Sequence, residues 1–229
     1  MNTKLNKIVQ NNNTKQGFSV IEIMVVLAIF FIMTSLSLVN YNRFGREVEL
    51  ENTAYELALT IRQAQFFGIN RSEEFGGGTN FDDPQPYGVY FNLESGDVDG
   101  INDQGFFMFV DQDNSRRFAD TDVSGTGGCL ANLSNECVNL YEFNRSNFIY
   151  EICVGSNAAN CNDITTLLPA GDTTMHVSFK RPNPDAAILI GSGANTTEYA
   201  YARITLRAPA DNIPDKSISI GAAGLISID

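Results

Sequence analysis

Residues 15–39 read KQGFSVIEIMVVLAIFFIMTSLSLV, and this stretch decides the fold. Between Phe18 and Val39 the only ionisable side chain is Glu22. About 20 apolar residues suffice for a helix to cross the hydrocarbon core of a bilayer, so we predict a transmembrane helix over residues 18–39. The preceding residues, 1–17, include three lysines and no acidic residue. This charge bias favours a cytoplasmic amino terminus and places residues 40–229 across the membrane.

Glu22 is the unusual residue of this segment, because a carboxylate inside a membrane helix is costly and marks a functional position. A secretory signal peptide does not fit, since its apolar region would span about 7–15 residues and a small-residue cleavage site would follow. A simple signal anchor fits the length but leaves Glu22 without a role. We therefore expect Glu22 to have a charged partner.

The string from Lys15 to Ile29 resembles the cleavage and methylation segment of type IV pilins and of the related type II secretion pseudopilins. The resemblance implies that a prepilin peptidase cuts after Gly17 and methylates the new amino terminus at Phe18. It also implies that Glu22 pairs with the amino-terminal charge of a neighbouring subunit. Opposite charges attract far more strongly in hydrocarbon than in water, so this pairing would set the register of a growing fibre.

Three later segments resemble, in pattern, the H-type minor pseudopilins and the FimT-like minor pilins. They are residues 87–91, residues 110–114 and the carboxyl-terminal strand pair at 218–228. One difference concerns the apolar segment, where many pilins carry a glycine and a proline. The first helix-weakening residue here is Gly45, which lies beyond the predicted membrane span.

The helix is predicted to continue beyond the membrane. An apolar stripe at spacings of four and three runs along residues 50–64, and it consists of Leu50, Ala54, Leu57, Ile61 and Ala64. No proline interrupts residues 18–67, and Gly68 with Asn70 offers a carboxyl-terminal cap. We therefore predict one helix over 18–68, in which residues 40–68 pack on the head through the stripe. Polar residues are expected to fill its opposite face.

The pattern changes to period two in the head, residues 69–229. Residues 174–180 alternate, with Met175, Val177 and Phe179 on one face and His176 on the face expected to meet solvent. The other predicted strands are separated by Gly, Asn, Asp and Pro clusters: 87–93, 106–111, 138–143, 148–154, 187–190, 199–207, 217–220 and 225–228. The predicted fold class is therefore α+β, a long amino-terminal helix packed against an antiparallel β-sheet head.

The four cysteines lie within residues 129–161. Because the predicted topology places them outside the cytoplasm, disulfides are permitted. Of the three possible connectivities we favour the two local closures, Cys129 with Cys137 and Cys153 with Cys161. The alternative is a zinc site formed by all four cysteines. The seven residues that separate the cysteines of each pair exceed the usual spacing of zinc ligands.

Acidic loops are the remaining candidates for binding chemistry. One holds Asp97, Asp99, Asn102 and Asp103; a second follows a strand and holds Asp111, Asp113, Asn114, Asp120 and Asp122. Oxygen ligands at alternating positions suit calcium. The loop does not complete an EF-hand motif, because in an EF-hand that began at Asp111 the required glycine would fall at Arg116. Solvated turn acids are the default interpretation, and calcium is the candidate metal at Asp111, Asp113, Asp120 and Asp122. Paired carboxylates for glycoside hydrolysis would need a pocket that the sequence does not indicate.

Composition excludes other roles. The chain has one histidine and no nucleotide-binding or nucleophile motif, so we predict no enzyme and no required cofactor. The net charge of −12 becomes −15 when the three leader lysines are removed, which disfavours nucleic acid as a partner. We predict a minor pilin or pseudopilin in the inner membrane and then in a pilus or pseudopilus. Its partners would be other pilin subunits, prepilin peptidase and inner-membrane assembly machinery. The alternative is an adhesin-like binding module on a pilin anchor.

Overall fold

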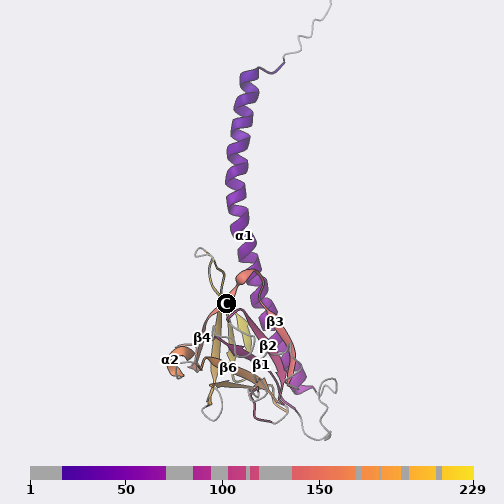
Figure 1. Cartoon of the computed structure of the whole chain (residues 1–229), viewed down its shortest axis with the longest axis vertical. Helices are drawn as coiled ribbons and strands as arrows, with labels where there is room; N and C mark the ends of the chain where they lie inside the picture. The colour runs from indigo at the N-terminus through magenta and orange to yellow at the C-terminus, as the bar shows by residue number, and fades with distance from the viewer. Residues whose placement is uncertain are drawn as a thin grey trace, which may run out of the picture. The chain divides into compact units, whose positions relative to one another are not determined.

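The computed structural model describes residues 17–70, 85–93, 103–111, 114–118, 136–168, 172–180, 182–191, 196–209 and 213–229. The chain divides into two compact units, Met1–Arg43 and Phe44–Asp229. We call Phe44–Asp229 the globular unit. One helix and two antiparallel sheets dominate the described part of the chain (Figure 1).

Helix α1 spans Val20–Ile69 without a break, close to the predicted 18–68. The backbone N–H and the side-chain amide of Asn70 both donate to the carbonyl of Phe66 and close the helix, as a cap does. Gly68 has a different role from the one predicted. It is inside the helix, and a Cβ there would collide with the carbonyl oxygen of Phe179, so glycine lets α1 approach strand β6.

Among the described residues, eleven strands form two sheets, and all the strand pairs are antiparallel. Sheet A has the order β3-β2-β1-β6-β7-β8, with bounds Cys137–Glu142, Gly105–Val110, Tyr87–Asn92, Thr174–Phe179, Ala186–Ile190 and Thr197–Tyr199. Sheet B has the order β11-β10-β9-β4-β5, with bounds Ile226–Ile228, Lys216–Gly221, Tyr201–Arg207, Phe148–Asn157 and Asn160–Asp163. A short helix α2, Ile164–Leu167, follows β5, and a 3₁₀ turn, Asn144–Ser146, precedes β4.

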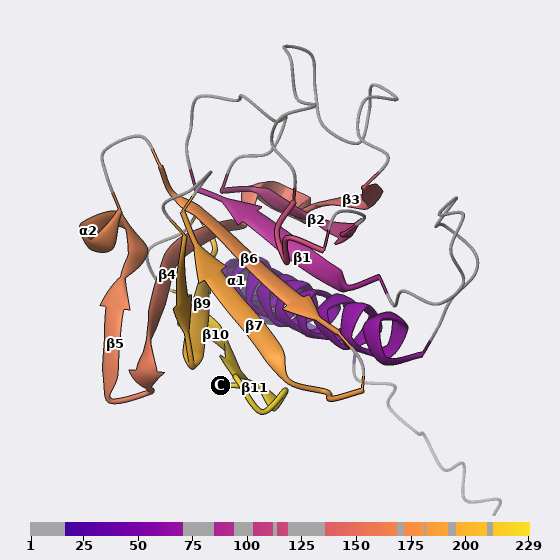
Figure 2. The ribbon, with the colours of Figure 1, turned by 90° about the horizontal axis from the view of Figure 1, so that it is seen from below.

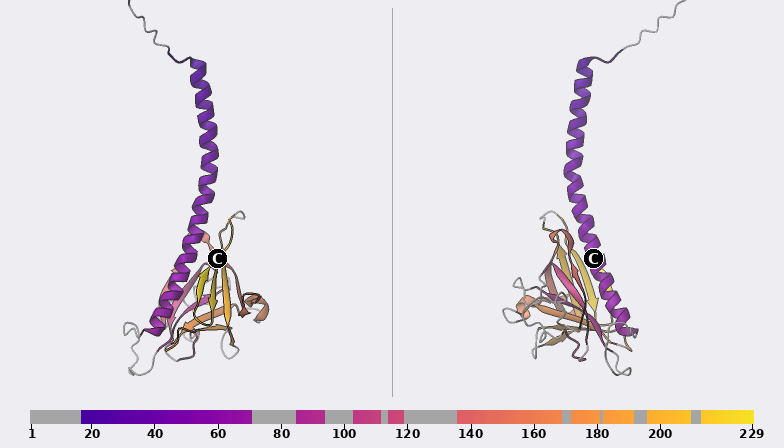
Figure 3. Two further views of the ribbon diagram at one scale, coloured as in Figure 1. Left: turned by 180° about the vertical axis from the view of Figure 1, so that it is seen from behind. Right: turned by 45° about the vertical axis from the view of Figure 1, so that its right-hand side comes forward.

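The core lies where the second half of α1 meets the inner faces of both sheets (Figure 2). The predicted helix stripe is fully buried, with Leu50, Leu57 and Ile61 in one cluster with side chains of both sheets. Polar contacts fix the same helix: Arg62 donates to the carbonyl of Ile226, and Thr53 accepts from the amide of Asn147. The views in Figure 3 show this part of α1 along one flank of the globular unit.

Two sequence predictions about strands need correction. The predicted strand 199–207 is two strands, because the chain leaves sheet A after Tyr199 and enters sheet B at Tyr201. The carbonyl of Ala200, at this crossing, accepts from the N–H of Ala222. Strand β5 was not predicted, since its four residues, NCND, carry no apolar alternation.

The prediction for His176 was wrong. Both faces of β6 are buried, and His176 packs against Tyr90 and Phe109 at ring-centroid distances of 4.9 and 6.4 Å. Phe118 covers this outer face of sheet A, and its backbone N–H donates to Nδ1 of His176 at 3.1 Å. Alternation separates the two faces of a strand but does not show that a distant segment covers the polar one.

The predicted fold class is confirmed: the protein is α+β, with an amino-terminal apolar helix and antiparallel sheets. The sequence periods explain why. Apolar residues at helical spacing bury one side of α1, and strands with period two supply the inner faces of the sheets.

Candidate functional site

The residues at the predicted processing point precede the helix. Gly17, Phe18 and Ser19 are not helical, and the first helical hydrogen bond runs from the N–H of Ile23 to the carbonyl of Ser19. Gly17 is exposed with no atom within 4 Å of the position of a Cβ, and the Phe18 side chain is 79% exposed. The peptide bond after Gly17 therefore lies in exposed, non-helical backbone.

Glu22 lies in the first turn of α1, and its side chain is exposed. The amino-terminal end of a helix carries unsatisfied N–H groups and a partial positive charge, which stabilise a carboxylate there. Within the described part of the chain, Glu22 forms no ion pair. The structure thus presents a carboxylate four residues after Phe18 that is open to a partner from another molecule.

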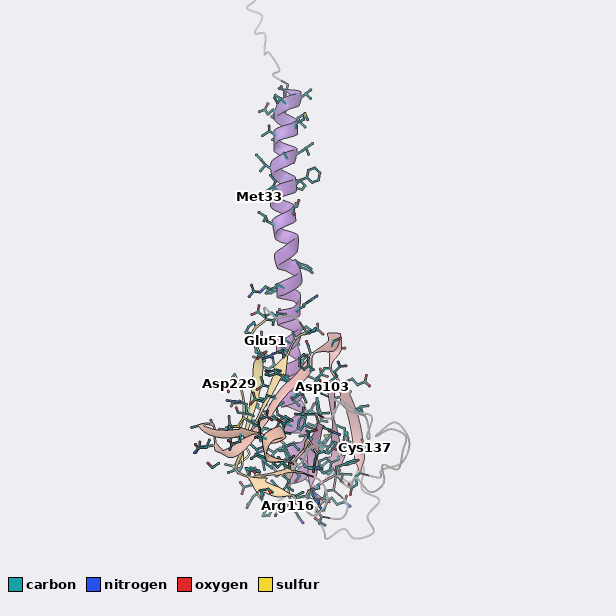
Figure 4. All side chains as sticks on the ribbon, turned by 60° about the vertical axis from the view of Figure 1, so that its left-hand side comes forward. Met33, Glu51, Asp103, Arg116, Cys137 and Asp229 are labelled. Carbon is teal, nitrogen blue, oxygen red and sulfur yellow. A yellow bond between two sulfur atoms is a disulfide. The ribbon has the colours of Figure 1, made fainter. Side chains whose placement is uncertain are left out.

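The apolar segment that follows is suited to lipid. Residues Val20–Ser37 have a mean hydropathy of 2.4, none of them is buried, and their side chains extend from the helix on all sides (Figure 4). At 1.5 Å per residue these 18 residues extend about 27 Å, close to the hydrocarbon thickness of a bilayer. The hydroxyl of Thr34 donates to the carbonyls of Phe30 and Phe31 at 2.9 and 3.1 Å, so this polar group is satisfied without water.

A disulfide joins Cys153 in β4 to Cys161 in β5, as expected from the sequence. Cys137, the first residue of β3, is also disulfide-bonded. Its predicted partner, Cys129, lies outside the described residues. The Cys153–Cys161 bridge closes the β4–β5 hairpin, and all three described cysteines are oxidised.

The second acidic loop is described only in part. The carboxylate of Asp111 is fully buried, and it accepts the N–H of Ser115 at 3.1 Å and that of Arg116 at 2.6 Å. It holds a turn in which Asn114 and Arg116 adopt positive φ angles of 60° and 63°. Both oxygens therefore serve the backbone, and no group of three potential metal ligands occurs among the described residues.

The other predicted acidic ligands stand apart from this turn or outside the description. Asp113, Asp120 and Asp122 lie outside the described residues, as do Asp97, Asp99 and Asn102 of the first loop. Asp103 is described, and partial burial raises the pKa of its carboxyl group. Calcium binding at these loops stays a prediction.

The structure also reveals a hollow that the sequence did not indicate. It has a volume of about 360 Å³ beside the ends of β6 and β7, and charges of both signs line it: Arg116, Lys180, Asp185 and Glu198. Arg116 lies 3.7 Å from Glu198, and Lys180 donates to the side-chain oxygen of Asn114 at 2.7 Å. Arg116 and Lys180 are 64 positions apart in sequence. The turn that holds Arg116 lies against β6, where the hydroxyl of Ser178 donates to the carbonyl of Arg116 at 3.1 Å.

A second feature contradicts the expectation of a polar outer face on α1. Tyr55, Leu59 and Phe66 in the globular unit are large, apolar and exposed. Their spacings of four and seven residues place them on one side of the helix. The signal was present in the sequence, because these residues follow the same helical period as the buried stripe.

Comparison with known proteins identifies one similarity. Residues 12–38 match the model of the prokaryotic N-terminal methylation motif, which is found in type IV pilin-like proteins. No curated protein and no solved structure is significantly similar to the chain. The match covers the segment around Gly17, Phe18 and Glu22, and it indicates prepilin-type processing and a structural role.

Proposed function

We propose that this chain is a minor subunit of a type IV pilus or of a type II secretion pseudopilus. A prepilin peptidase cleaves after Gly17 and methylates Phe18, and the inner-membrane assembly machinery then incorporates the subunit through α1. The observation that supports this proposal best is the exposed Glu22 carboxylate in the first turn of an unburied apolar helix. Glu22 follows the accessible Gly17 by five residues, and both lie within the methylation motif.

The proposed organisation follows from these features. Residues 1–17 are the leader, 18–39 span the inner membrane before assembly, 40–68 pack on the head, and 69–229 form a head outside the cytoplasm. The disulfide between Cys153 and Cys161 supports an oxidising compartment for the head. The size of the head favours a minor subunit over a densely packed major one. The cysteine-bearing segment 125–162 is not an insertion in this head, because it supplies β3 of sheet A and β4 of sheet B.

A catalytic role is not proposed. The chain has a single histidine, and it is buried with Nδ1 engaged by Phe118, so it is shielded from a substrate. The match to the methylation motif also supports a structural subunit rather than an enzyme.

The test is the replacement of Glu22 by alanine, with Glu56→Ala as the matched control on an exposed part of the same helix. Removing a carboxylate from the apolar segment leaves membrane insertion intact or improved. Because the amino-terminal charge of the neighbour then lacks its partner, we expect incorporation into fibres to fail for Glu22→Ala and to persist for Glu56→Ala. Equal amounts of both variants in sheared fibres would refute the proposed role of Glu22.

A second candidate function is an adhesin-like binding module, favoured by the charged hollow beside Arg116 and Lys180. If the acidic loops bind calcium and support this surface, millimolar calcium should raise the thermal unfolding temperature of the protein. An unfolding temperature that is equal with calcium and with magnesium would argue against a calcium-dependent module.

A further inference from the structure

The turn that joins β3 to β4 carries the acceptor motif of N-linked glycosylation. In this motif an asparagine is followed, two positions later, by serine or threonine, and the residue between them is not proline. Residues 144–146 read NRS, and they form the 3₁₀ turn Asn144–Ser146. The motif therefore lies on a connection between strands, where a folded chain offers its side chains to an enzyme.

The chain contains this motif five times, and the structure distinguishes between the copies that it describes. The five asparagines are Asn12, Asn70, Asn132, Asn144 and Asn195. Three of them, at positions 12, 132 and 195, lie outside the described residues. The amide of Asn70 is engaged, because it donates to the carbonyl of Phe66 at 3.0 Å and caps α1.

Asn144 is exposed, and a neighbouring asparagine holds the turn in place. The buried side-chain amide of Asn147 donates to the hydroxyl of Thr53 in α1 at 3.0 Å, and its backbone N–H donates to the carbonyl of Asn144 at 3.2 Å. Within the described part of the chain, the side-chain amide of Asn144 forms no hydrogen bond. The turn is thus anchored by Asn147, and the side-chain nitrogen of Asn144 is available for a reaction.

The third residue of the motif has a backbone conformation that serine seldom adopts. Ser146 has a φ angle of 61°, in the left-handed region that favours glycine or asparagine. Glycine at this position would remove the strain, but it would also remove the hydroxyl that the motif requires. Strained residues of this kind gather at functional positions. The turn therefore carries an exposed hydroxyl where its backbone favours a residue without one.

Glu142 adds a negative charge two positions before Asn144. It ends β3, its side chain is exposed, and it forms no ion pair with any described residue. The other four motifs have no acidic residue at this place, where they carry Gln10, Gly68, Leu130 and Gly193. A basic residue of a transferase can donate a strong hydrogen bond to such a carboxylate. Residues 142–146 thus present a charge, an amide and a hydroxyl together.

We propose that Asn144 is a site of N-linked glycosylation, with Glu142 and Ser146 as the residues that a transferase recognises. The inference rests on the proposed function, which places the head outside the cytoplasm, where secreted chains receive such sugars. The donor is an oligosaccharide joined to a lipid through a diphosphate. A bond forms between Nδ2 of Asn144 and C1 of the first sugar, and the bond from C1 to the diphosphate oxygen breaks. The diphosphate leaves with the electron pair, and the amide loses one proton to a base of the transferase.

The first experiment is intact-mass analysis of the full chain recovered from its own membrane, with peptide fragmentation to locate any added mass. The variant is Asn144→Gln, and the matched control is Asn139→Gln, at an exposed asparagine of β3 outside any motif. We expect the mass of one oligosaccharide on residue 144 of the wild type and of the control, and its complete loss in Asn144→Gln. A wild type without this mass, or an added mass that persists in Asn144→Gln, would overturn the inference.

The second experiment separates recognition from folding. Ser146→Gly relieves the positive φ, so its urea unfolding midpoint should equal or exceed that of the wild type, while the oligosaccharide is lost. Glu142→Gln should lower the modified fraction about tenfold, because a hydrogen bond to a charged group is lost, and Glu142→Asp should retain it. A fully modified Ser146→Gly would overturn the proposed site. Equal modified fractions in Glu142→Gln and Glu142→Asp would overturn the role of Glu142.

The same mass spectra report the amino terminus, so the two proposals fail separately. Chains that begin at Phe18 and lack the oligosaccharide overturn the inference and leave the proposed function intact. Chains that begin at Met1 and lack it overturn both. Chains that begin at Met1 and carry it on residue 144 support the glycosylation site and contradict the proposed processing.

Discussion

Lowering the pH is expected to destabilise the globular unit through His176. The imidazole is fully buried, so loss of hydration of the charged form lowers the pKa of His176 from 6.5 to about 3. The nearby charge of Arg117 lowers this pKa further, and that of Asp172 opposes the shift. The N–H of Phe118 needs the unprotonated Nδ1 as its acceptor, which acts in the same direction.

The sign and size follow from proton linkage. Above pH 6.5 the histidine is neutral in both the folded and the unfolded chain, and its titration contributes nothing. Between pH 6.5 and 3 the unfolded chain binds a proton that the folded chain does not, so the free energy of unfolding falls as the pH falls. At about 1.36 kcal/mol for each pH unit, the loss from His176 amounts to about 3 kcal/mol at pH 4.

The assay is urea unfolding of residues 44–229 at several pH values between 7.5 and 4. Every described buried apolar side chain lies between Leu50 and Ile226, so this segment contains the described core. The reference is His176→Gln, which keeps a polar side chain but does not titrate. The wild type should lose about 3 kcal/mol more than the variant over this range. Parallel curves for the two proteins would refute the burial of a neutral imidazole.

Three further changes test the packing of the globular unit by urea unfolding. Gly68→Ala should lower the free energy of unfolding by about 1–3 kcal/mol, because the new Cβ meets the carbonyl of Phe179. The control Gly45→Ala, in open space, should raise this free energy slightly. Equal effects of the two substitutions would refute the close approach of α1 to β6. Replacing Cys153 and Cys161 together by serine should cost about 2–3 kcal/mol for a sequence separation of 8, and a neutral result would contradict the bridge. Asp111→Ala should cost about 2–3 kcal/mol, since the N–H groups of Ser115 and Arg116 lose their acceptor, and an unchanged midpoint would exclude that role.

The sequence predicted those features that depend on local period and composition. The apolar run after Gly17, the buried stripe at Leu50, Leu57 and Ile61, and most strands follow from spacing alone, because one side of each element must be buried. The Cys153–Cys161 bridge followed from proximity in sequence.

Features that depend on distant segments were missed. Alternation placed His176 on the outer face of β6, but only the fold shows that Phe118 returns to cover it. The hollow lined by Arg116 and Lys180 likewise arises when residues far apart in sequence meet. The two-sheet arrangement divided one predicted strand at Ala200, where no apolar pattern changes.

The roles of Gly17, Phe18 and Glu22 came from a resemblance, which the match to the methylation motif over residues 12–38 supports. The structure adds that Gly17 and Phe18 are exposed before the helix and that Glu22 lies in its first turn. The pairing that we propose for Glu22 involves a second molecule, so a single chain does not contain it.

The most direct test of the account is intact-mass and amino-terminal analysis of the protein recovered from its own membrane. The account predicts a chain that begins at N-methylated Phe18, while a Gly17→Val variant, whose side chain blocks the cleavage point, keeps the full length. A wild-type chain that still begins at Met1 would contradict it.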